Sequence, residues 1–276
     1  DNVIYFDGTV ASDPANEKFL HNEFGVNYRF GKLGINASAY NTDWQDRNLT
    51  KSVTTGQGDS GDTDVIFLTG VNQKHSGVEL ETNYMVNDML DLMFVASFGN
   101  WKFDGDANGN YQETEYNSEG QAVGYKTTEY AYALDGLYVG DMPQTSYVLG
   151  VTLKPIKDLR IQAIHKMYDK NYSDWSPSAR EFDGTNDDAD RAQVWEAPSY
   201  NRLDLHMSYK LPKVKDLDMV LTANIFNALD EVYVQDAVDN SQYNGFGSKQ
   251  HLAHNAEVFL GTPRYANIGL SRSEER

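Results

Sequence analysis

Short and long connections alternate along this chain, and this alternation is the feature that most constrains its fold. Four short connections, at Gly31-Lys32, Asn87-Asp88, 156–158 and 212–216, alternate with four long ones at about 42–63, 104–142, 173–198 and 228–261. An antiparallel barrel that crosses a bilayer has tight turns at one rim and long loops at the other. The connections of a β-sandwich need not alternate in this way. The pattern therefore predicts an up-and-down transmembrane β-barrel, with short periplasmic turns and long extracellular loops.

Between the connections, apolar and polar residues alternate with the period of two that is typical of strands. The segment 201–211 has Leu203, Leu205 and Met207 on one face, with Asp204 and His206 on the other. The fold class is therefore all-β and antiparallel. We expect nine strands, at about 22–30, 33–45, 64–86, 89–103, 144–155, 158–172, 200–211, 217–227 and 262–272.

Nine strands of alternating direction cannot close into an antiparallel barrel, because the first and the ninth run the same way. Single-chain bacterial barrels have even strand numbers. We therefore expect residues 1–276 to be part of a larger barrel, or to pair with another piece. The chain starts with Asp1 and shows no signal peptide, which indicates a mature protein or an internal piece.

Composition excludes several classes of protein. The net charge is −18, which disfavours binding to nucleic acid or to an anionic lipid surface. The mean hydropathy is −0.60, and no stretch approaches the roughly 18 apolar residues of a membrane-spanning helix. Barrel strands escape such a test, because inward polar residues alternate with outward apolar ones. The absence of Cys mildly favours a protein of the cell envelope.

Aromatic residues fall where the two membrane interfaces of a barrel would lie. Those with outward parity near the tight turns are Tyr28, Phe30, Tyr84 and Tyr209, and those near the long connections are Phe98 and Tyr147. The alternative is that these are ordinary strand aromatics of a soluble sheet.

The last three predicted strands resemble those of TonB-dependent receptors. They read NRLDLHMSYKLP, LDMVLTANIFNALDEVYV and AEVFLGTPRYANIGLS. The run 224–227, Asn-Ile-Phe-Asn, followed by Tyr233, is similar to the signature of the penultimate strand in that family. Pro263-Arg264 is similar to the start of its final strand. The ending, SRSEER, departs from the aromatic residue with which the family usually ends.

Upstream segments extend the resemblance over nearly the whole chain. One such segment is TGVNQKHSGVELETNY, in which Gly70 and Gly77 begin a run that resembles the Gly-x6-Gly-Val-Glu-Leu-Glu pattern of the family. Another is DMPQTSYVLGVTLKP, which resembles a family strand start marked by Asp141 and Pro143. The similarity is closest to receptors of Bacteroidota. It implies that residues 1–276 are the C-terminal part of the receptor barrel, without the plug domain, the energy-coupling box and the N-terminal strands.

The resemblance also implies a function. Such receptors bind a scarce nutrient, which would be a siderophore–metal complex, a glycan, a peptide or a cobalamin, and import it with energy from the TonB complex. The implied partners are outer-membrane lipid, the TonB complex through the N-terminal region, and a surface lipoprotein. The implied location is the outer membrane of a Gram-negative bacterium. The inward polar residues would face the lumen, and they include Glu79, Glu81, Asp91, Asp204 and His206.

Two other functions remain open at this point, and an enzyme is not expected. A passive porin-like channel would have the same strand pattern without a plug. A secreted carbohydrate-binding β-sandwich would bury its apolar strand faces against a second sheet. The motifs of common hydrolases, such as G-x-S-x-G and H-E-x-x-H, are absent from the sequence.

One segment matches a calcium-binding pattern. Residues 104–115, DGDANGNYQETE, fit D-x-[DN]-x-[DN]-G-x5-E. Ca²⁺ binds six to eight hard oxygen ligands. The predicted ligands are Asp104, Asp106, Asn108, Asn110 through its backbone carbonyl, and Glu115. The alternative is a chance match in an acidic loop, because a strand precedes the segment and no helix follows.

The long connections also contain His and aromatic residues. His251, His254 and Glu257 are spaced three apart and would share one face of a helix, but we interpret this stretch as a loop with ordinary polar residues. Loop aromatics would stack on a ligand or, more often, pack the loops together. They include Tyr111, Tyr116, Tyr125, Tyr130, Trp175 and Trp195.

Overall fold

The computed structural model describes residues 16–55, 62–183, 188–213, 217–241 and 250–274. Its regular structure is almost entirely strand. The helical elements of the described residues are α1 (Pro177–Arg180) and the 3-10 turn η1 (Ala253–Asn255). No helix among these residues is long and apolar enough to cross a membrane.

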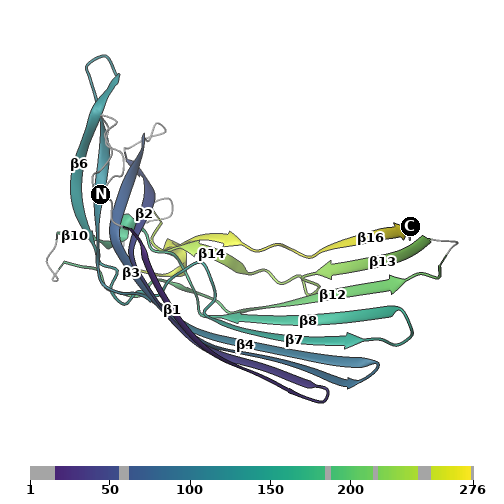
Figure 1. The fold of residues 1–276 in the computed structure, drawn as a ribbon. Helices are drawn as coiled ribbons and strands as arrows, with labels where there is room; N and C mark the ends of the chain where they lie inside the picture. Colours follow the sequence, from purple (N-terminus) through teal and green to yellow (C-terminus); the bar gives the residue numbers. More distant parts are fainter. Residues whose placement is uncertain (1–15, 56–61, 184–187, 214–216, 242–249, 275–276) are drawn as a thin grey trace.

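In the described part of the chain, twelve strands form one sheet, and nine of them remain when the β5, β6 and β10 branch is set aside. These nine pair in chain order as an antiparallel meander, which confirms the all-β, antiparallel class, while the closure of the barrel and its strand number stay predictions (Figure 1). They are β1 (Lys18–Phe30), β2 (Leu33–Thr55), β3 (Asp62–Asn87), β4 (Leu90–Phe103), β7 (Thr145–Leu153), β8 (Leu159–Asp169), β12 (Tyr200–Lys210), β13 (Leu217–Phe226) and β16 (Tyr265–Glu274).

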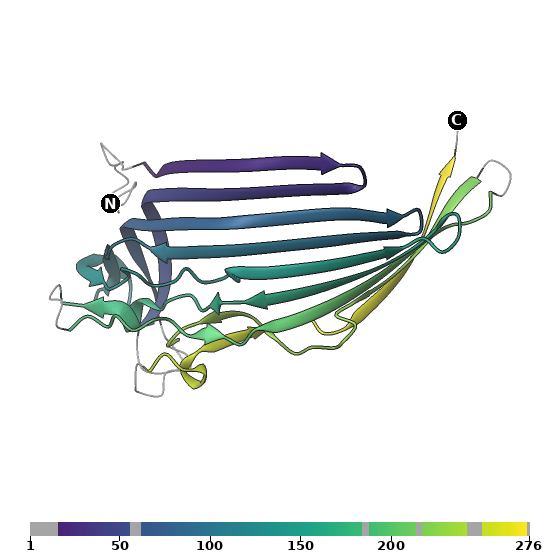
Figure 2. The ribbon, with the colours of Figure 1, turned by 90° about the horizontal axis from the view of Figure 1, so that it is seen from below.

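The sheet curves into a trough, and its two ends differ (Figures 1 and 2). The tight turns lie at one end of the strands, and the long connections lie at the other. Gly31 adopts a left-handed φ of 55° in the turn between β1 and β2, and Asp158 adopts a φ of 70° in the turn before β8. Of the turn at 212–216, residues 214–216 lie outside the described part of the chain. The predicted long connection at 42–63 is wrong in its described part, because β2 continues to Thr55 and pairs with β3 from Asp62, whereas 104–142, 173–198 and 228–261 do connect neighbouring strands of the meander.

The strand register collects the apolar residues on one face. One row of cross-strand partners runs Tyr28, Ile35, Thr82, Phe94, Leu149. This face is largely uncovered, because exposed apolar side chains lie along it. They include Phe24, Tyr28, Phe30, Val78, Tyr84, Phe98, Leu149 and Ile268. A soluble monomer rarely exposes such a continuous apolar surface, so the face requires another covering medium.

The edges of the meander are β1 and β16. Among the described residues, β1 pairs only with β2, and β16 pairs only with β13. Their backbone hydrogen-bonding groups on the outer side are therefore available for further strands. An unpaired edge of this length is a site for strand pairing.

The long connections are more regular than the sequence pattern indicates. The hairpin of β5 (Ala107–Tyr116) and β6 (Ala122–Tyr132) continues the sheet beside β3, and β10 (Glu181–Phe182) pairs with β6. Strands β9 (Asn171–Tyr172) and β11 (Glu196–Ala197) form one small sheet, and β14 (Val234–Val238) and β15 (Glu257–Leu260) form another. The residues of these strands do not alternate clearly between apolar and polar, so the sequence pattern does not show them.

A buried hydrophobic core lies at this end of the molecule. It is centred on Trp175, which packs edge-on against Phe103 at 6.3 Å between ring centroids and lies 5.9 Å from the ring of Tyr132. Leu134 and Leu137 are also buried in it. The loop aromatic Trp175 therefore packs the loops together. Tyr130 packs against the same core, while the side chains of Tyr111 and Tyr125 lie outside the described part.

Candidate ligand-binding wall

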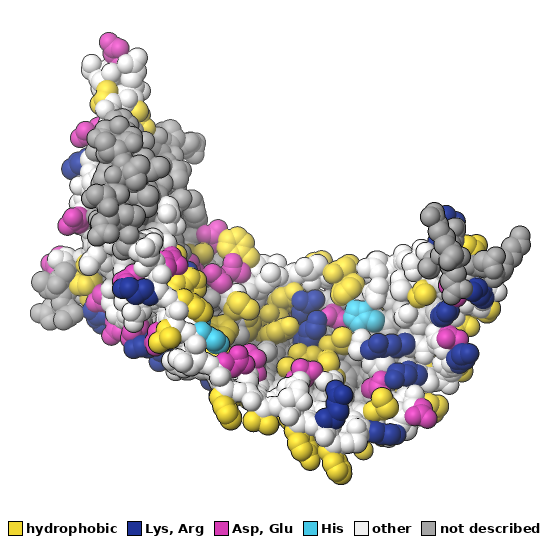
Figure 3. Space-filling model, in the orientation of Figure 1, with side chains coloured by type: hydrophobic (Ala, Val, Ile, Leu, Met, Phe, Trp, Pro, Cys, Tyr) yellow, Lys and Arg dark blue, Asp and Glu magenta, His cyan; other side chains and the backbone are white. Residues whose placement is uncertain are grey.

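The predicted lumen residues share the face opposite the apolar rows. A polar row crosses the sheet through the partners Asp91, Thr152, Gln162, His206 and Asn224. Hydrogen bonds join its members: Gln162 Nε2 donates to Thr152 Oγ1 at 3.2 Å, and His206 Nδ1 lies 2.8 Å from Asn224 Oδ1. Charged side chains gather on the concave surface, while apolar ones protrude from the convex underside (Figure 3).

Near the long connections, this face carries three neighbouring rings that we call the aromatic platform: Tyr40, His75 and Trp101. Trp101 Nε1 donates a hydrogen bond to Tyr40 Oη at 2.9 Å, and the His75 ring stacks on Trp101 at 5.5 Å between centroids. The platform lines an open cavity of about 360 Å³. That volume is within the usual range of small-molecule sites, roughly 300–1,000 Å³. The cavity is also lined by Phe19, His21, Glu23, Thr42, Trp44 and Glu79.

Two glycines, Gly77 and Gly99, are cross-strand partners beneath the platform. A Cβ atom at Gly77 would lie 2.5 Å from Tyr40 Oη, and one at Gly99 would lie 2.8 Å from the ring of Trp101. Real Cβ atoms do not approach so closely, so any larger residue would displace a ring. The glycine pair therefore lets Tyr40 and Trp101 lie flat against the wall.

A buried glutamine fixes the backbone of Trp101. The Trp101 N–H donates to Gln144 Oε1 at 2.9 Å, and Gln144 Nε2 donates to the carbonyl oxygens of Trp101 at 3.0 Å and Val139 at 3.2 Å. Gln144 is 2% exposed. Sequence reasoning missed the platform and Gln144. The alternation of residues places Tyr40, His75 and Trp101 on one face, but their proximity depends on the strand register.

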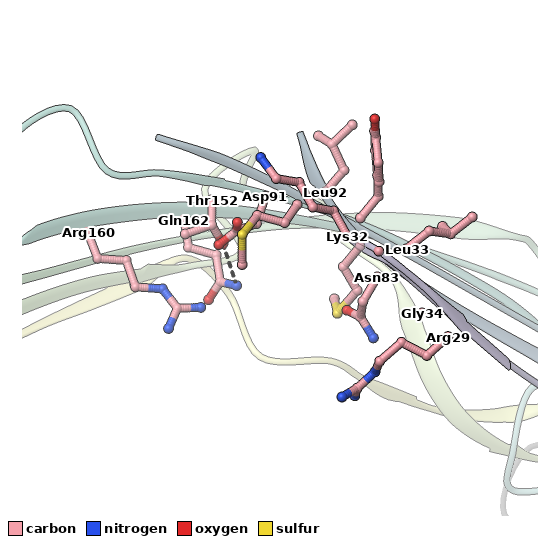
Figure 4. Close-up of a pocket in the computed structure, with 14 residues that line it drawn as sticks. Arg29, Lys32, Leu33, Gly34, Asn83, Asp91, Leu92, Thr152, Arg160 and Gln162 are labelled. Atoms are coloured by element: carbon pink, nitrogen blue, oxygen red, sulfur yellow. Dashed lines mark hydrogen bonds between the residues drawn. The ribbon is translucent and has the colours of Figure 1, made fainter. Parts of the chain in front are cut away.

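A second cavity, of about 540 Å³, lies at the tight-turn end of the same face (Figure 4). Arg29 and Arg160 project into it, and Asp91 forms an ion pair with Lys154 at 2.6 Å. It lies at the end away from the long connections. Aromatic rings and carboxylates meet at the smaller cavity, beside those connections.

The Asn-Ile-Phe-Asn signature has a structural role in this chain. Asn227 directly follows β13, has a φ of 48° and is fully buried. Its side chain donates to the carbonyl oxygens of Glu231 at 2.9 Å and Thr262 at 3.2 Å. Its N–H donates to the carboxylate of Asp204 at 2.9 Å, and Lys166 pairs with the same carboxylate at 2.9 Å. Asp204 of β12 therefore holds the residue that follows the C-terminal end of β13.

The five residues of the calcium pattern are spread along the chain. Asp104 pairs with Lys74 at 2.8 Å, and Asp106 pairs with both terminal nitrogens of Arg191 at 2.9 and 2.7 Å. Asn108, Asn110 and Glu115 lie in β5. At about 3.3 Å per strand residue, positions 108 and 115 are roughly 23 Å apart. The structure does not bring the five together, and calcium binding stays a prediction.

The spaced residues His251, His254 and Glu257 do not converge either. His251 contacts Asp239 and Asp190, Glu257 accepts a hydrogen bond from Ser241, and His254 is exposed. No group of three or more His, Cys, Asp and Glu side chains within the described part of the chain is placed to hold a metal ion.

Comparisons with known proteins agree with this architecture. The family model described as "TonB dependent receptor-like, beta-barrel" matches residues 5–228. The chain therefore belongs to the TonB-dependent receptor-like β-barrel family. No curated protein matches the sequence.

Solved structures of receptors and transporters share the fold. The copper transporter OprC is 17% identical with a TM-score of 0.53, over 93% of this chain and 31% of that one. The siderophore receptor PiuA from Acinetobacter baumannii is 18% identical with a TM-score of 0.53, over 92% and 28%. The ferric-catecholate import receptor Fiu from E. coli K12 is 13% identical with a TM-score of 0.50, over 97% and 30%. The chain spans about a third of each of these proteins, which are receptors or transporters and not enzymes.

Proposed function

We propose that this chain is the C-terminal barrel wall of an outer-membrane receptor that imports a scarce nutrient with energy from TonB. The observation that carries the proposal is the division of the meander into two faces, one of exposed apolar residues and one of polar rows. A wall between lipid and an aqueous lumen requires this division. Membership of the receptor family supports the transport role.

The remainder of the barrel pairs with the free edges of β1 and β16. Additional strands, from upstream residues of the same protein or from another piece, would satisfy both edges and close the barrel. A plug domain in the lumen would face the polar rows. The resemblance noted in the sequence also favours a source in Bacteroidota and a surface lipoprotein as partner.

The aromatic platform is the ligand contact on this wall. Aromatic rings offer a large apolar surface with little conformational freedom to lose on binding, and the neighbouring Glu23 and Glu79 supply hydrogen-bond acceptors. The candidate nutrients remain a siderophore–metal complex, a glycan, a peptide or a cobalamin. The two carboxylates disfavour a strongly anionic ligand.

Uptake measurements distinguish an energised receptor from a passive channel. Cells that depend on the full-length protein would be supplied with each nutrient class in turn as the limiting source, with and without a functional TonB complex. An energised receptor supports growth on one class only when TonB is functional. Growth that continues without TonB would identify a passive porin-like channel.

The structure disfavours the third interpretation, a secreted carbohydrate-binding β-sandwich. Its apolar strand face would be buried against a second sheet, but that face is exposed here and the meander belongs to a single sheet. Fractionation of the full-length protein tests this directly. We expect it in the outer membrane, folded and β-rich only with detergent or lipid. A folded protein in plain buffer would contradict the proposal.

Calcium binding at residues 104–115 is a separate proposal from the sequence pattern. We expect Ca²⁺ to protect this connection from protease relative to a chelator, because bound ligands would restrain its backbone. Glu115→Gln should abolish the protection, since it removes the carboxylate at the last position of the pattern. Equal cleavage with and without Ca²⁺ would refute it.

A further inference from the structure

A buried arginine joins two of the long connections. Arg180, at the end of α1, has no exposed surface. Its Nη1 donates to the carbonyl oxygens of Asp190 at 2.9 Å and Ala192 at 2.7 Å, within the connection 173–198. Its Nη2 donates to the Asp239 carboxylate at 3.3 Å, in the connection 228–261. A buried cation must be paired in this way, because water cannot solvate it.

The third long connection is attached to the same residue. The carbonyl oxygen of Arg180 accepts a hydrogen bond from the N–H of Ala133 at 2.8 Å. The next residue, Glu181, begins β10, which pairs with β6 of the connection 104–142. Movement of Arg180 would therefore disturb three of the four long connections together.

His251 closes the arrangement between two carboxylates. Its Nδ1 lies 2.5 Å from Asp239 Oδ2, and its Nε2 lies 2.9 Å from Asp190 Oδ2. Ionised carboxylates accept hydrogen bonds and cannot donate them. While both carboxylates are ionised, both ring nitrogens therefore carry a proton, and His251 is the positively charged imidazolium.

Two other nitrogens approach Nδ1, and they do not change this assignment. Arg180 Nη2 and Asn240 Nδ2 each lie 3.1 Å from Nδ1. Either one would donate to a bare nitrogen, but the Asp239 oxygen is much closer. A lone pair facing that oxygen at 2.5 Å would be repelled, so the proton lies between Nδ1 and Asp239.

The charges of the four side chains balance only when His251 is protonated. Two cations, Arg180 and His251, then face two carboxylates, Asp190 and Asp239. Loss of the His251 proton would leave one uncompensated negative charge beside a fully buried arginine. An uncompensated charge in such a site is strongly unfavourable.

We propose that Arg180, Asp190, Asp239 and His251 form a pH-sensitive clasp, closed while His251 is an imidazolium, that holds three extracellular connections in one arrangement. The clasp goes beyond the transport function, because it would control the opening of the loop end without contacting the nutrient. It loosens when His251 loses a proton and both carboxylates can no longer be satisfied.

The directions of the pKa shifts define the pH window. The hydrogen bond to Asp239 raises the pKa of His251, Asp190 adds to the rise, and burial and Arg180 oppose it. Burial opposes ionisation of Asp190, but hydrogen bonds from His251 and Ala192 and the two cations lower its pKa overall. The clasp is therefore closed between the lowered pKa of Asp190 and the raised pKa of His251, and it opens as the pH rises through the latter.

Distances between spin labels test the clasp in the full-length protein in lipid. None of the 276 residues is Cys, so Glu181→Cys on β10 and Ala253→Cys in η1 introduce two labelling sites. Cysteines elsewhere in the protein would be replaced by Ser. We expect a narrow distance distribution below the raised pKa of His251 that broadens reversibly as the pH rises through it.

Matched variants separate the clasp from general loosening. His251→Gln should give the broad distribution at every pH. The Gln side chain is neutral, so it cannot supply the positive charge that the two carboxylates require. Arg191→Gln, which breaks an ion pair outside the clasp, should keep the pH dependence. The proposal would be overturned if the distribution in the parent protein stayed narrow at alkaline pH. This test does not depend on the folding of any clasp variant. An unchanged narrow distribution in folded His251→Gln would also overturn it.

Discussion

The two ends of this molecule are built for different solvents. Along the meander, large apolar side chains such as Phe24 and Ile268 are exposed, and the wall is one sheet thick. At the loop end, Trp175, Leu134 and their neighbours form a buried core, with a paired charge cluster around Arg180. One end has the interior of a water-soluble domain, whereas the other presents its apolar side chains outward.

This difference separates the sources of stability. In the proposed barrel wall, backbone hydrogen bonds between strands and contact with lipid would replace a side-chain core. At the loop end, burial of apolar area and paired charges hold the connections, as in ordinary globular proteins. A change in one region should therefore affect that region much more than the other.

The largest expected effect comes from the loop core. Trp175→Ala should destabilise the packed loops by about 3–5 kcal/mol, because it removes a buried aromatic ring and leaves a cavity. Protease sensitivity of the connections should rise, while circular dichroism and heat resistance of the wall stay unchanged. Trp101→Ala, outside that core, is the control. Joint unfolding of wall and loops in Trp175→Ala would break the comparison.

A pair of adjacent substitutions tests the wall. Phe94 lies on the apolar face and Val95 on the polar face beside Glu81. Phe94→Lys should cost about 2–4 kcal/mol in lipid, because it places a charge against hydrocarbon. Val95→Lys should cost much less. Denaturant titration in lipid vesicles measures both, and equal costs would show that the two faces have the same surroundings.

The aromatic platform predicts a smaller effect, on binding. Gly77→Ala should displace the ring of Tyr40. Binding of the nutrient should then weaken about tenfold, or by ~1.4 kcal/mol. Gly34→Ala, where the new atom meets only Asn83 O at 3.9 Å, is the control. Tryptophan fluorescence should shift in the first variant only. Equal binding by the two variants would show that the aromatic platform does not contact the nutrient.

The smallest effect belongs to an exposed ion pair at the loop end. Arg191→Gln should cost about 0.2–1 kcal/mol at neutral pH, as usual for such pairs. The hydrogen bond from Arg191 lowers the pKa of Asp106 below 3.8. The pair therefore stabilises above that value and is lost as the pH falls below the lowered pKa. Loop stability at neutral and acidic pH should converge between parent and variant, and a constant difference would contradict the assignment.

The wall was predictable from the sequence, whereas the loop end was not. Period-two alternation locates the nine strands of the meander because apolar residues such as Leu80 and Phe94 share one face. Strands β5 and β6 do not show that alternation clearly. Trp101 and Gln144 meet across 43 positions, and Arg180 and His251 meet across 71. Such contacts depend on register and loop packing, which local patterns do not contain.

The central claim is that alternate residues of the meander face lipid and water, and cysteine labelling along β3 tests it most directly. Single cysteines would replace Val78, Glu79, Leu80 and Glu81 in the full-length protein in outer membranes. A charged maleimide should label positions 79 and 81, while positions 78 and 80 should react only after detergent denaturation. Equal labelling of all four positions would contradict the claim that this chain is the wall of an outer-membrane barrel.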